Sequence, residues 1–520
     1  MRFILLKGND IMKLLNEEEM YLKCLQKGSK KSNVDGDIIV PDAKPDVLKV
    51  LQVDAKSVIL DKGFYPKGIY AQGKVYINIL YIPDCEEDGT YCINTSFEFK
   101  EHFDIPDLNE EMDLKILSDV VRVEFTLINS RKLNIKSLVK FDYEVFNKEV
   151  LCLPYSYDEG DLECMEDKIH INMNALYDEC KVTIRDTLEI PSAKPSVKEI
   201  IKTDTKIFSY ETKILPSKLV IKGILNSSIL YITGDENVDC IEENLPFTEV
   251  FDIDNAQESD ICNIDISVLD CSIDLSCDND GDYRIISLNC LIGLNLTFLR
   301  NKEITYIKDC YCAGNKTDLS YNNIVLDEFI DYIKKEISQK ELFETDKNLP
   351  EIVKIYNTVS EIEIENACAK DGYIIVSGKI KFYISYITDN PKCAVFSLKK
   401  EIPFEYEYKS DQAKEGMQVF AKLFISNIYC TKTHQNEIEL KYFVSSEILV
   451  TKKRELNIIC GLETSPITSC NDIVIYFVKN DENLWDIGKK YSIRQEDIIK
   501  LNNLESCDLK KGQKLLIPVK

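Results

Sequence analysis

One pattern is written three times along this chain of 520 residues, and that repetition limits the folds it can adopt. PDAKPDVLKVL, which begins at Pro41, returns 150 positions later as PSAKPSVKEII, which begins at Pro191. A glycine followed by an apolar segment ending in Tyr-Ile stands at Gly73, Gly223 and Gly378. The third copy lacks the Ala-Lys-Pro signature but keeps this glycine segment. Self-similarity at a nearly constant spacing predicts three copies of one folding unit.

Alternating side chains predict that each copy is built mainly of β-strands. In KVYINILY, which begins at Lys74, one face would carry Val75, Ile77, Ile79 and Tyr81. Such period-two alternation, with many β-branched and aromatic residues, is typical of strands. VVRVEFTLI and AKLFISNIYC follow the same rule. We therefore predict a mainly β fold with three tandem β-rich repeat domains.

Two features suggest local helix within this β-rich body. KPDVLKVL and KPSVKEII are compatible with one or two helical turns, because proline suits the first helical position. The segment 320–343 carries Leu326, Phe329, Ile330, Ile333 and Ile337 at spacings of three or four. That spacing predicts an amphipathic helix that links the second and third repeats.

The repeats and the changes in pattern predict a division of the whole chain. We expect an N-terminal segment at 1–35, repeat 1 at 36–165, repeat 2 at 175–302, a linking helix at 320–343, repeat 3 at 344–455, a linker at 456–471 and a small C-terminal domain at 472–520.

Charge and the N-terminus narrow the classes of partner and the location. The net charge of −25 argues against binding to nucleic acid or broadly to anionic membranes, since both need a basic surface. The first apolar run is interrupted at Lys7 and Asp10, which is too soon for a signal peptide. No apolar run reaches transmembrane length. We expect a cytosolic protein whose translation starts at Met1 or Met12.

Neither the cysteines nor the histidines form a pattern that predicts chemistry. The 19 cysteines are odd in number and scattered, and the closest pair, Cys310 and Cys312, has no histidine nearby. Reduced cysteines that serve as small core residues are the better interpretation. There are only three histidines, and no Walker loop, G-x-S-x-G or H-E-x-x-H motif occurs. We expect no enzyme activity, metal or cofactor.

The last fifty residues follow a different pattern, with the order β-α-α-β. IVIYFVK begins at Ile473 and predicts a strand. Asn483 is placed to cap a first helix, LWDIGKKY, and SIRQEDIIKLNNL predicts a second. GQKLLIP, which begins at Gly512, predicts a closing strand. The predicted fold class is thus completed by a small βααβ domain.

This tail resembles a LysM domain. The family's pattern is matched by Val478-Lys479, Leu484-Trp485-Asp486-Ile487, Tyr491-Ser492-Ile493, Leu501-Asn502-Asn503-Leu504 and the run from Leu509 to Pro518. The resemblance implies a glycan-binding groove between two loops, whose residues here are Asp481, Glu482, Asn483, Leu484, Asn503, Leu504, Glu505 and Ser506. The family's Gly-Asp-Ser/Thr is Asp481-Glu482-Asn483 in this chain, so we expect glycan binding to be weak or absent.

The first strand of the tail predicts a surface for a protein partner. If Tyr476 and Val478 point into the small core, alternation turns Ile473, Ile475 and Phe477 to the opposite face. Three large apolar side chains on a solvent face indicate a contact surface, unless the body of the chain covers them. Basic residues give residues 473–520 a net charge of +2 on an acidic body, which would favour an acidic partner, and Lys479 lies beside the apolar face.

Trp485, the single tryptophan of the chain, falls at the aromatic position of the LysM pattern. It has two open interpretations: an aromatic that seals a very small core, or an anchor with one edge available to a partner.

Repeats marked by P-x-A-K-P and followed by a LysM domain resemble the SipL-type spore-coat morphogenesis proteins, whose repeat is often called the SPOCS domain. The resemblance implies a non-enzymatic protein in the mother-cell cytosol, at the forespore surface and in the spore coat. It also implies that the LysM domain binds the ATPase of the coat's basal layer, with other coat proteins as further candidates. The alternative is a protein that binds peptidoglycan or a lipid-linked precursor at the forespore surface. A cell-wall hydrolase is disfavoured by the missing catalytic motifs.

Overall fold

The computed structural model describes residues 14–84, 90–157, 161–235, 237–346, 348–390, 394–434, 437–467, 472–480, 482–504 and 506–519. Repeat 1 contains β1 (Leu14–Ile39), β2 (Val47–Tyr65), β3 (Gly68–Pro83), β4 (Tyr91–Asp104), β5 (Asp113–Asn129) and β6 (Lys132–Tyr157). Repeat 2 contains β7 (Leu162–Glu189), β8 (Val197–Leu215), β9 (Lys218–Thr233), β10 (Val238–Asp252), β11 (Ile261–Cys277) and β12 (Tyr283–Cys312).

Repeat 3 contains β13 (Asn315–Glu344), β14 (Ile352–Lys370), β15 (Tyr373–Thr388), β16 (Val395–Lys409), β17 (Gln418–His434) and β18 (Glu437–Pro466). The C-terminal domain contains β19 (Asp472–Phe477), α1 (Leu484–Tyr491), α2 (Gln495–Asn502) and β20 (Lys514–Val519). Within the part of the chain that the structure describes, neither helix has the length and apolar character that crossing a bilayer requires.

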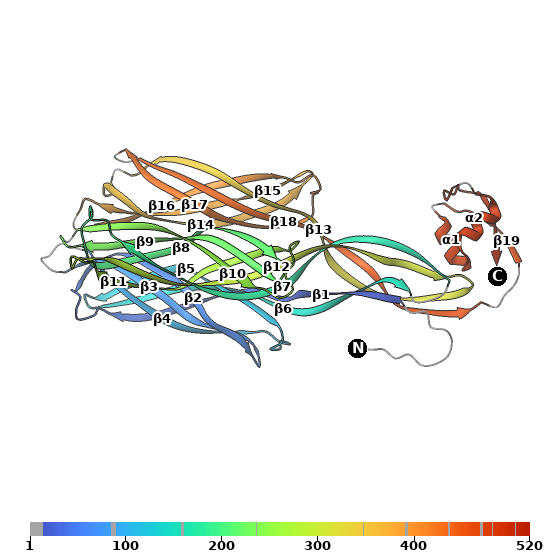
Figure 1. Cartoon of the computed structure of the whole chain (residues 1–520), viewed down its shortest axis with the longest axis horizontal. Helices are drawn as coiled ribbons and strands as arrows, with labels where there is room; N and C mark the ends of the chain where they lie inside the picture. Colours follow the sequence, from blue (N-terminus) through green and yellow to red (C-terminus); the bar gives the residue numbers. More distant parts are fainter. Residues whose placement is uncertain are drawn as a thin grey trace.

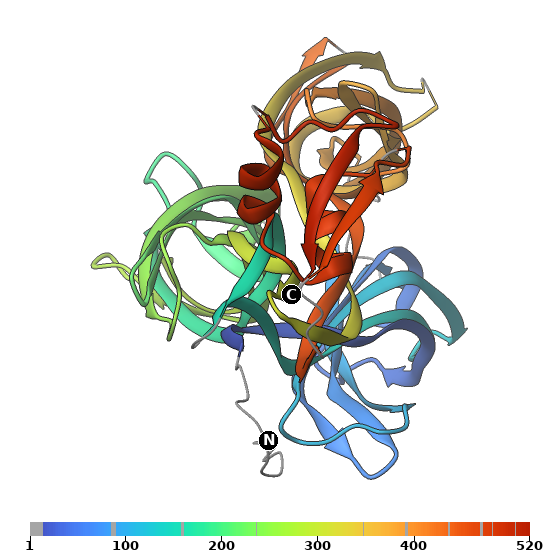
Figure 2. The same cartoon turned by 90° about the vertical axis from the view of Figure 1, so that its right-hand side faces the viewer.

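Each repeat closes two antiparallel layers around its own core. In repeat 1 the layer β2-β3-β4 faces the layer β1-β6-β5, and repeats 2 and 3 reproduce this order with β8-β9-β10 and β7-β12-β11, then β14-β15-β16 and β13-β18-β17. The alternating segments after Gly73 and Gly378 supply buried residues to these cores, as predicted, with Ile79 and Phe382 fully buried. Seen end-on, the three repeats surround a common axis (Figure 2).

Six long strands leave the three repeats at one end and form a stalk (Figure 1). They are β1, β6, β7, β12, β13 and β18, each of 26 to 30 residues. Smaller apolar clusters fill the stalk, with Ile171, Leu153 and Leu456 among their buried members. The chain passes from one repeat to the next at the far end of this stalk, after β6 and after β12. We call this end, residues 161–163, 309–317 and 462–466, the stalk tip.

The linking helix predicted at 320–343 is wrong, because this segment lies within strand β13, paired antiparallel to β18. The register of β13 shifts between Ser320 and Tyr321 and again between Phe329 and Asp331. Each shift reverses which residues face inward, so the buried or half-buried positions change from even numbers near Leu326 to odd numbers from Ile337 onward. The resulting spacing of three and four imitates a helix.

The helical turns predicted at 44–51 and 194–201 are wrong, because a turn after Pro41 and Pro191 leads directly into strands β2 and β8. The Lys44 amide donates to the Pro41 carbonyl at 2.9 Å, and the Lys194 amide donates to the Pro191 carbonyl at 2.8 Å. Pro45 then precedes β2, where extended backbone is favoured before and after a proline. The Ala-Lys-Pro signature thus marks the turn between two layers of a repeat.

Two predicted boundaries also change. Residues 14–35, expected to form an N-terminal segment apart from repeat 1, make up most of β1 and pair with β6. Residues 456–466, expected as linker, complete β18 and pair with β13. Both errors arise because the stalk strands continue well beyond the repeated motifs, and their pairing is long-range.

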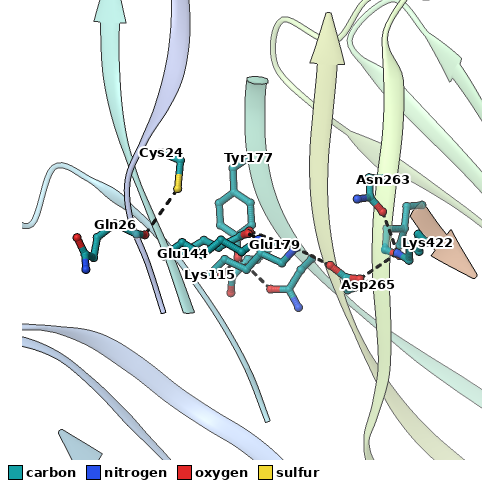
Figure 3. A network of polar contacts seen from close by, with 12 residues as sticks. Cys24, Gln26, Lys115, Glu144, Tyr177, Glu179, Asn263, Asp265 and Lys422 are labelled. Atoms are coloured by element: carbon teal, nitrogen blue, oxygen red, sulfur yellow. Dashed lines mark hydrogen bonds and ion pairs between the residues drawn. The ribbon is translucent and has the colours of Figure 1, made fainter. Parts of the chain in front are cut away.

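Two ion pairs of one aspartate join all three repeats (Figure 3). Asp265 of β11 accepts from Lys115 of β5 at 2.6 Å and from Lys422 of β17 at 2.9 Å. Burial raises the pKa of Asp265, but the two ammonium groups outweigh that cost, so its pKa lies below the ordinary value. Each repeat contributes one side chain, so this contact favours the three repeats in one fixed arrangement.

Candidate functional site

The C-terminal domain is a compact unit whose helices begin and end on local signals. Its core gathers Tyr476, Val478, Leu484, Ile487, Ile493, Ile498, Leu515 and Ile517. The side chain of Asn483 accepts from the Asp486 amide at 2.9 Å and caps α1, as predicted. Ser492 and Asn503 end the two helices in left-handed backbone conformations. The predicted β-α-α-β order is confirmed.

The apolar face predicted on the first strand is present on β19. Ile473, Ile475 and Phe477 are 62%, 53% and 61% exposed, whereas Tyr476 and Val478 are buried. The body of the chain therefore leaves these three side chains largely in solvent. Lys479 is also exposed and lies two positions after Phe477. We call Ile473, Ile475 and Phe477 the β19 face.

In the first groove loop, the carboxylate of Glu482 is held by hydrogen bonds within the domain. Both carboxylate oxygens of Glu482 accept from the Tyr476 hydroxyl, at 2.7 and 2.8 Å, and one accepts from the Lys479 amide at 2.9 Å. These hydrogen bonds, first that of Lys479 and then that of Tyr476, lower the pKa of Glu482. The Glu482 carboxylate is therefore tied back to the end of β19.

The other groove residues take varied positions. Leu484 is buried in the core, Leu504 packs against that core, and Asn503 and Ser506 are exposed. Asp481 and Glu505 lie outside the described residues. The prediction that these loops form an altered glycan-type site stays a prediction.

Trp485 faces the body of the chain. Its indole N–H donates to Oδ2 of Asp309 at 3.0 Å, and its ring meets the Tyr311 ring edge-on with centroids 5.0 Å apart. Lys489, one turn later on α1, donates to Oδ1 of the same Asp309 at 2.5 Å. Trp485 is only 7% exposed. Trp485 therefore contacts two residues at the end of β12. Its role in partner binding stays a prediction.

Further contacts seat the C-terminal domain on the stalk tip. The Tyr311 hydroxyl donates to the Ile493 carbonyl at 2.9 Å, and the Gly314 amide donates to the Ser492 carbonyl at 2.7 Å. Arg494 pairs with Asp161. The Tyr311 hydroxyl approaches α1 so closely that a Cβ at Gly488 would lie 2.4 Å from it. Nothing in the sequence pattern pointed to this contact, because its two sides are more than 170 positions apart.

Comparison with protein families identifies both parts of the chain. The SipL, SPOCS domain family matches residues 46–128, 196–276 and 351–433, and the LysM domain family matches residues 476–518. The chain carries three SPOCS domains and a LysM domain. Its three SPOCS matches cover β2 to β5, β8 to β11 and β14 to β17, and therefore leave out the long stalk strands. Comparison with curated proteins and with solved structures gave no match.

Proposed function

We propose that this protein is a non-enzymatic adaptor of spore coat assembly that docks through its LysM domain onto the ATPase of the coat's basal layer. The three matches to the SipL, SPOCS domain family support a role in sporulation, and SPOCS and LysM domains are typically non-catalytic. In this proposal the protein works in the mother-cell cytosol, gathers at the forespore surface and becomes part of the coat.

The observation that carries the docking proposal is the β19 face. Three large apolar side chains that are each more than half exposed carry a cost in water that contact with a partner would remove. The opposite side of the LysM domain, with Trp485 and Lys489, is already occupied by Asp309 and Tyr311. We therefore assign partner contact to the β19 face and Lys479, and assign to Trp485 the holding of the domain in a fixed orientation.

The stalk supports the assignment of partner contact to the β19 face. It separates the LysM domain from the bulk of the three repeats, so that a large partner can approach the β19 face (Figure 1). The repeats would then offer further surfaces to other coat proteins. The hydrogen bonds of Glu482 with Tyr476 and with the Lys479 amide fix the conformation of the first groove loop. This altered loop supports a protein ligand over a glycan.

Binding of the purified full chain to the basal-layer ATPase tests the proposal. Ile475→Ser and Phe477→Ser are each expected to weaken binding at least about tenfold, because apolar anchors dominate such interfaces. Leu501→Ser is the matched control, since Leu501 is a 38% exposed apolar residue on α2 of the same domain. Unchanged affinity of both β19 variants would overturn the assignment. Binding of chitin oligomers at similar strength would favour the cell-wall-precursor alternative.

A further inference from the structure

Two cysteines of repeat 2 stand directly opposite each other on neighbouring strands. In the antiparallel pairing of β11 with β12, Cys271 is the partner of Cys290. Opposite residues point to the same face, and their Cα atoms are about 4.5–5.5 Å apart. This separation lies within the range that a disulfide bond spans, about 4.4–6.8 Å.

The surroundings give the two thiols different access. Cys290 is fully buried in the core of repeat 2, and Cys271 is partly buried against the same core. Among the described residues, β11 pairs only with β12, so Cys271 lies on an edge strand of its sheet. A soluble oxidant would therefore reach Cys271 first.

The chemistry of the two thiols also differs. A hydrogen bond with Cys290, a second with Thr205 and the nearby charge of Lys56 lower the pKa of Cys271, although burial and Asp270 act in the opposite direction. The same hydrogen bond and burial raise the pKa of Cys290. A thiol that ionises readily beside a second thiol is the arrangement in which disulfides form by exchange.

We propose that Cys271 and Cys290 form an oxidation site that closes to an intramolecular disulfide when it meets a disulfide oxidant. The Cys271 thiolate attacks one sulfur of the oxidant, whose sulfur–sulfur bond breaks and releases one thiol. Cys290 then loses its proton to solvent and attacks the Cys271 sulfur, which releases the second thiol. The two cysteines are oxidised by two electrons, and one oxidant disulfide becomes two thiols. The product ties edge strand β11 covalently to β12.

The chain contains its own control. Cys164 of β7 is the direct partner of Cys310 of β12, so these two cysteines also stand opposite each other on antiparallel strands. There burial, reinforced by Glu166 and Glu163, raises the pKa of Cys164 to about 11, and burial raises the pKa of Cys310 to about 12. This second pair is expected to stay reduced under conditions that oxidise the first.

The experiment treats the native full chain with oxidised glutathione, blocks the remaining thiols by alkylation and maps the products by non-reducing peptide mass spectrometry. We expect the Cys271–Cys290 link to form at least about tenfold faster than any Cys164–Cys310 link, since thiolate fraction sets the rate. Oxidation should also raise the thermal unfolding midpoint of the chain, because the link restricts its unfolded state.

Two variants separate the steps. Cys290→Ser is expected to trap one glutathione on Cys271, whereas Cys271→Ser should give neither a link nor an adduct at Cys290. Circular dichroism establishes that each variant is folded, and the result with the unsubstituted chain does not depend on them. Equal rates for the two cysteine pairs, or two reduced thiols at 271 and 290 after oxidation, would overturn the proposal.

Discussion

At the scale of single residues, Trp485 contacts side chains that its motif does not reveal. Its position in the LysM pattern was readable from the sequence, and so was the alternation that exposes the β19 face. Its partners Asp309 and Tyr311 were not, because they come from the end of a strand in another domain. Sequence patterns report on neighbours along the chain, whereas this contact depends on where the stalk ends.

Removal of the Asp309 carboxylate should loosen the LysM domain from the stalk tip. Asp309→Ala leaves the indole N–H and the Lys489 ammonium without their shared acceptor, so Trp485 becomes more accessible to water. Since Trp485 is the only tryptophan, its fluorescence reports on this contact alone. We expect a red-shifted emission and stronger quenching by acrylamide.

Asp411→Ala is the matched control, because Asp411 is an exposed carboxylate of repeat 3 whose ion pair with Lys409 lies outside the stalk tip. Its emission should equal that of the unsubstituted chain. Identical emission and quenching for Asp309→Ala would show that Asp309 does not hold the domain.

At the scale of elements, the predictions succeeded where the side-chain period stayed regular. The segments after Gly73 and Gly378 keep a period of two and were assigned correctly as strands. β13 was missed because two register shifts break its period. The helical turns predicted at 44–51 and 194–201 are instead the ends of turns and the first residues of β2 and β8, since proline is common both in turns and at helix starts.

A pair of substitutions in β13 tests its strand conformation and its place in the stalk core. Leu326 is 9% exposed and packs in the stalk, while its neighbour Val325 is 56% exposed. Leu326→Ala is expected to lower the free energy of unfolding by about 2–5 kcal/mol, because it leaves a cavity. Val325→Ala should change it by no more than about 0.5 kcal/mol.

Urea denaturation followed by circular dichroism measures both variants. Similar losses at the two positions would be inconsistent with a strand that buries one neighbour and exposes the other.

At the scale of the whole molecule, three copies of one unit behave as a single scaffold because their contacts are not equivalent. Repeats 1 and 3 each bring a lysine to one aspartate of repeat 2, so the three copies contribute different side chains to the contact that joins them. The repetition and the mainly β class were readable from the sequence. The stalk and the ion pairs of Asp265 could not be read from the sequence, since both depend on contacts between distant segments.

Asp265→Asn should weaken the association of the three repeats. It removes the carboxylate that Lys115 and Lys422 share, and it leaves Lys115, whose side chain is 11% exposed, with the carboxylate of Glu144 at 3.8 Å. We expect a loss of about 1–3 kcal/mol in the free energy of unfolding at neutral pH. Because the folded pKa of Asp265 lies below its ordinary value, this contribution is present above that ordinary value and declines as the pH falls through the lowered pKa.

The difference between Asp265→Asn and the unsubstituted chain should therefore shrink on acidification, as calorimetry at a series of pH values would reveal. Asp274→Asn on the same strand is the control, because Asp274 is exposed. A constant difference at all pH values would contradict the proposed ionic role.

The most direct test of the adaptor proposal is site-specific photo-crosslinking of the full chain in sporulating cells. A photoreactive amino acid at Phe477 should link the chain to the basal-layer ATPase, whereas the same group at Leu501 should not. At Trp485 it should link to the chain's own stalk tip. Crosslinks to the ATPase from position 501 or 485, with none from position 477, would contradict the account.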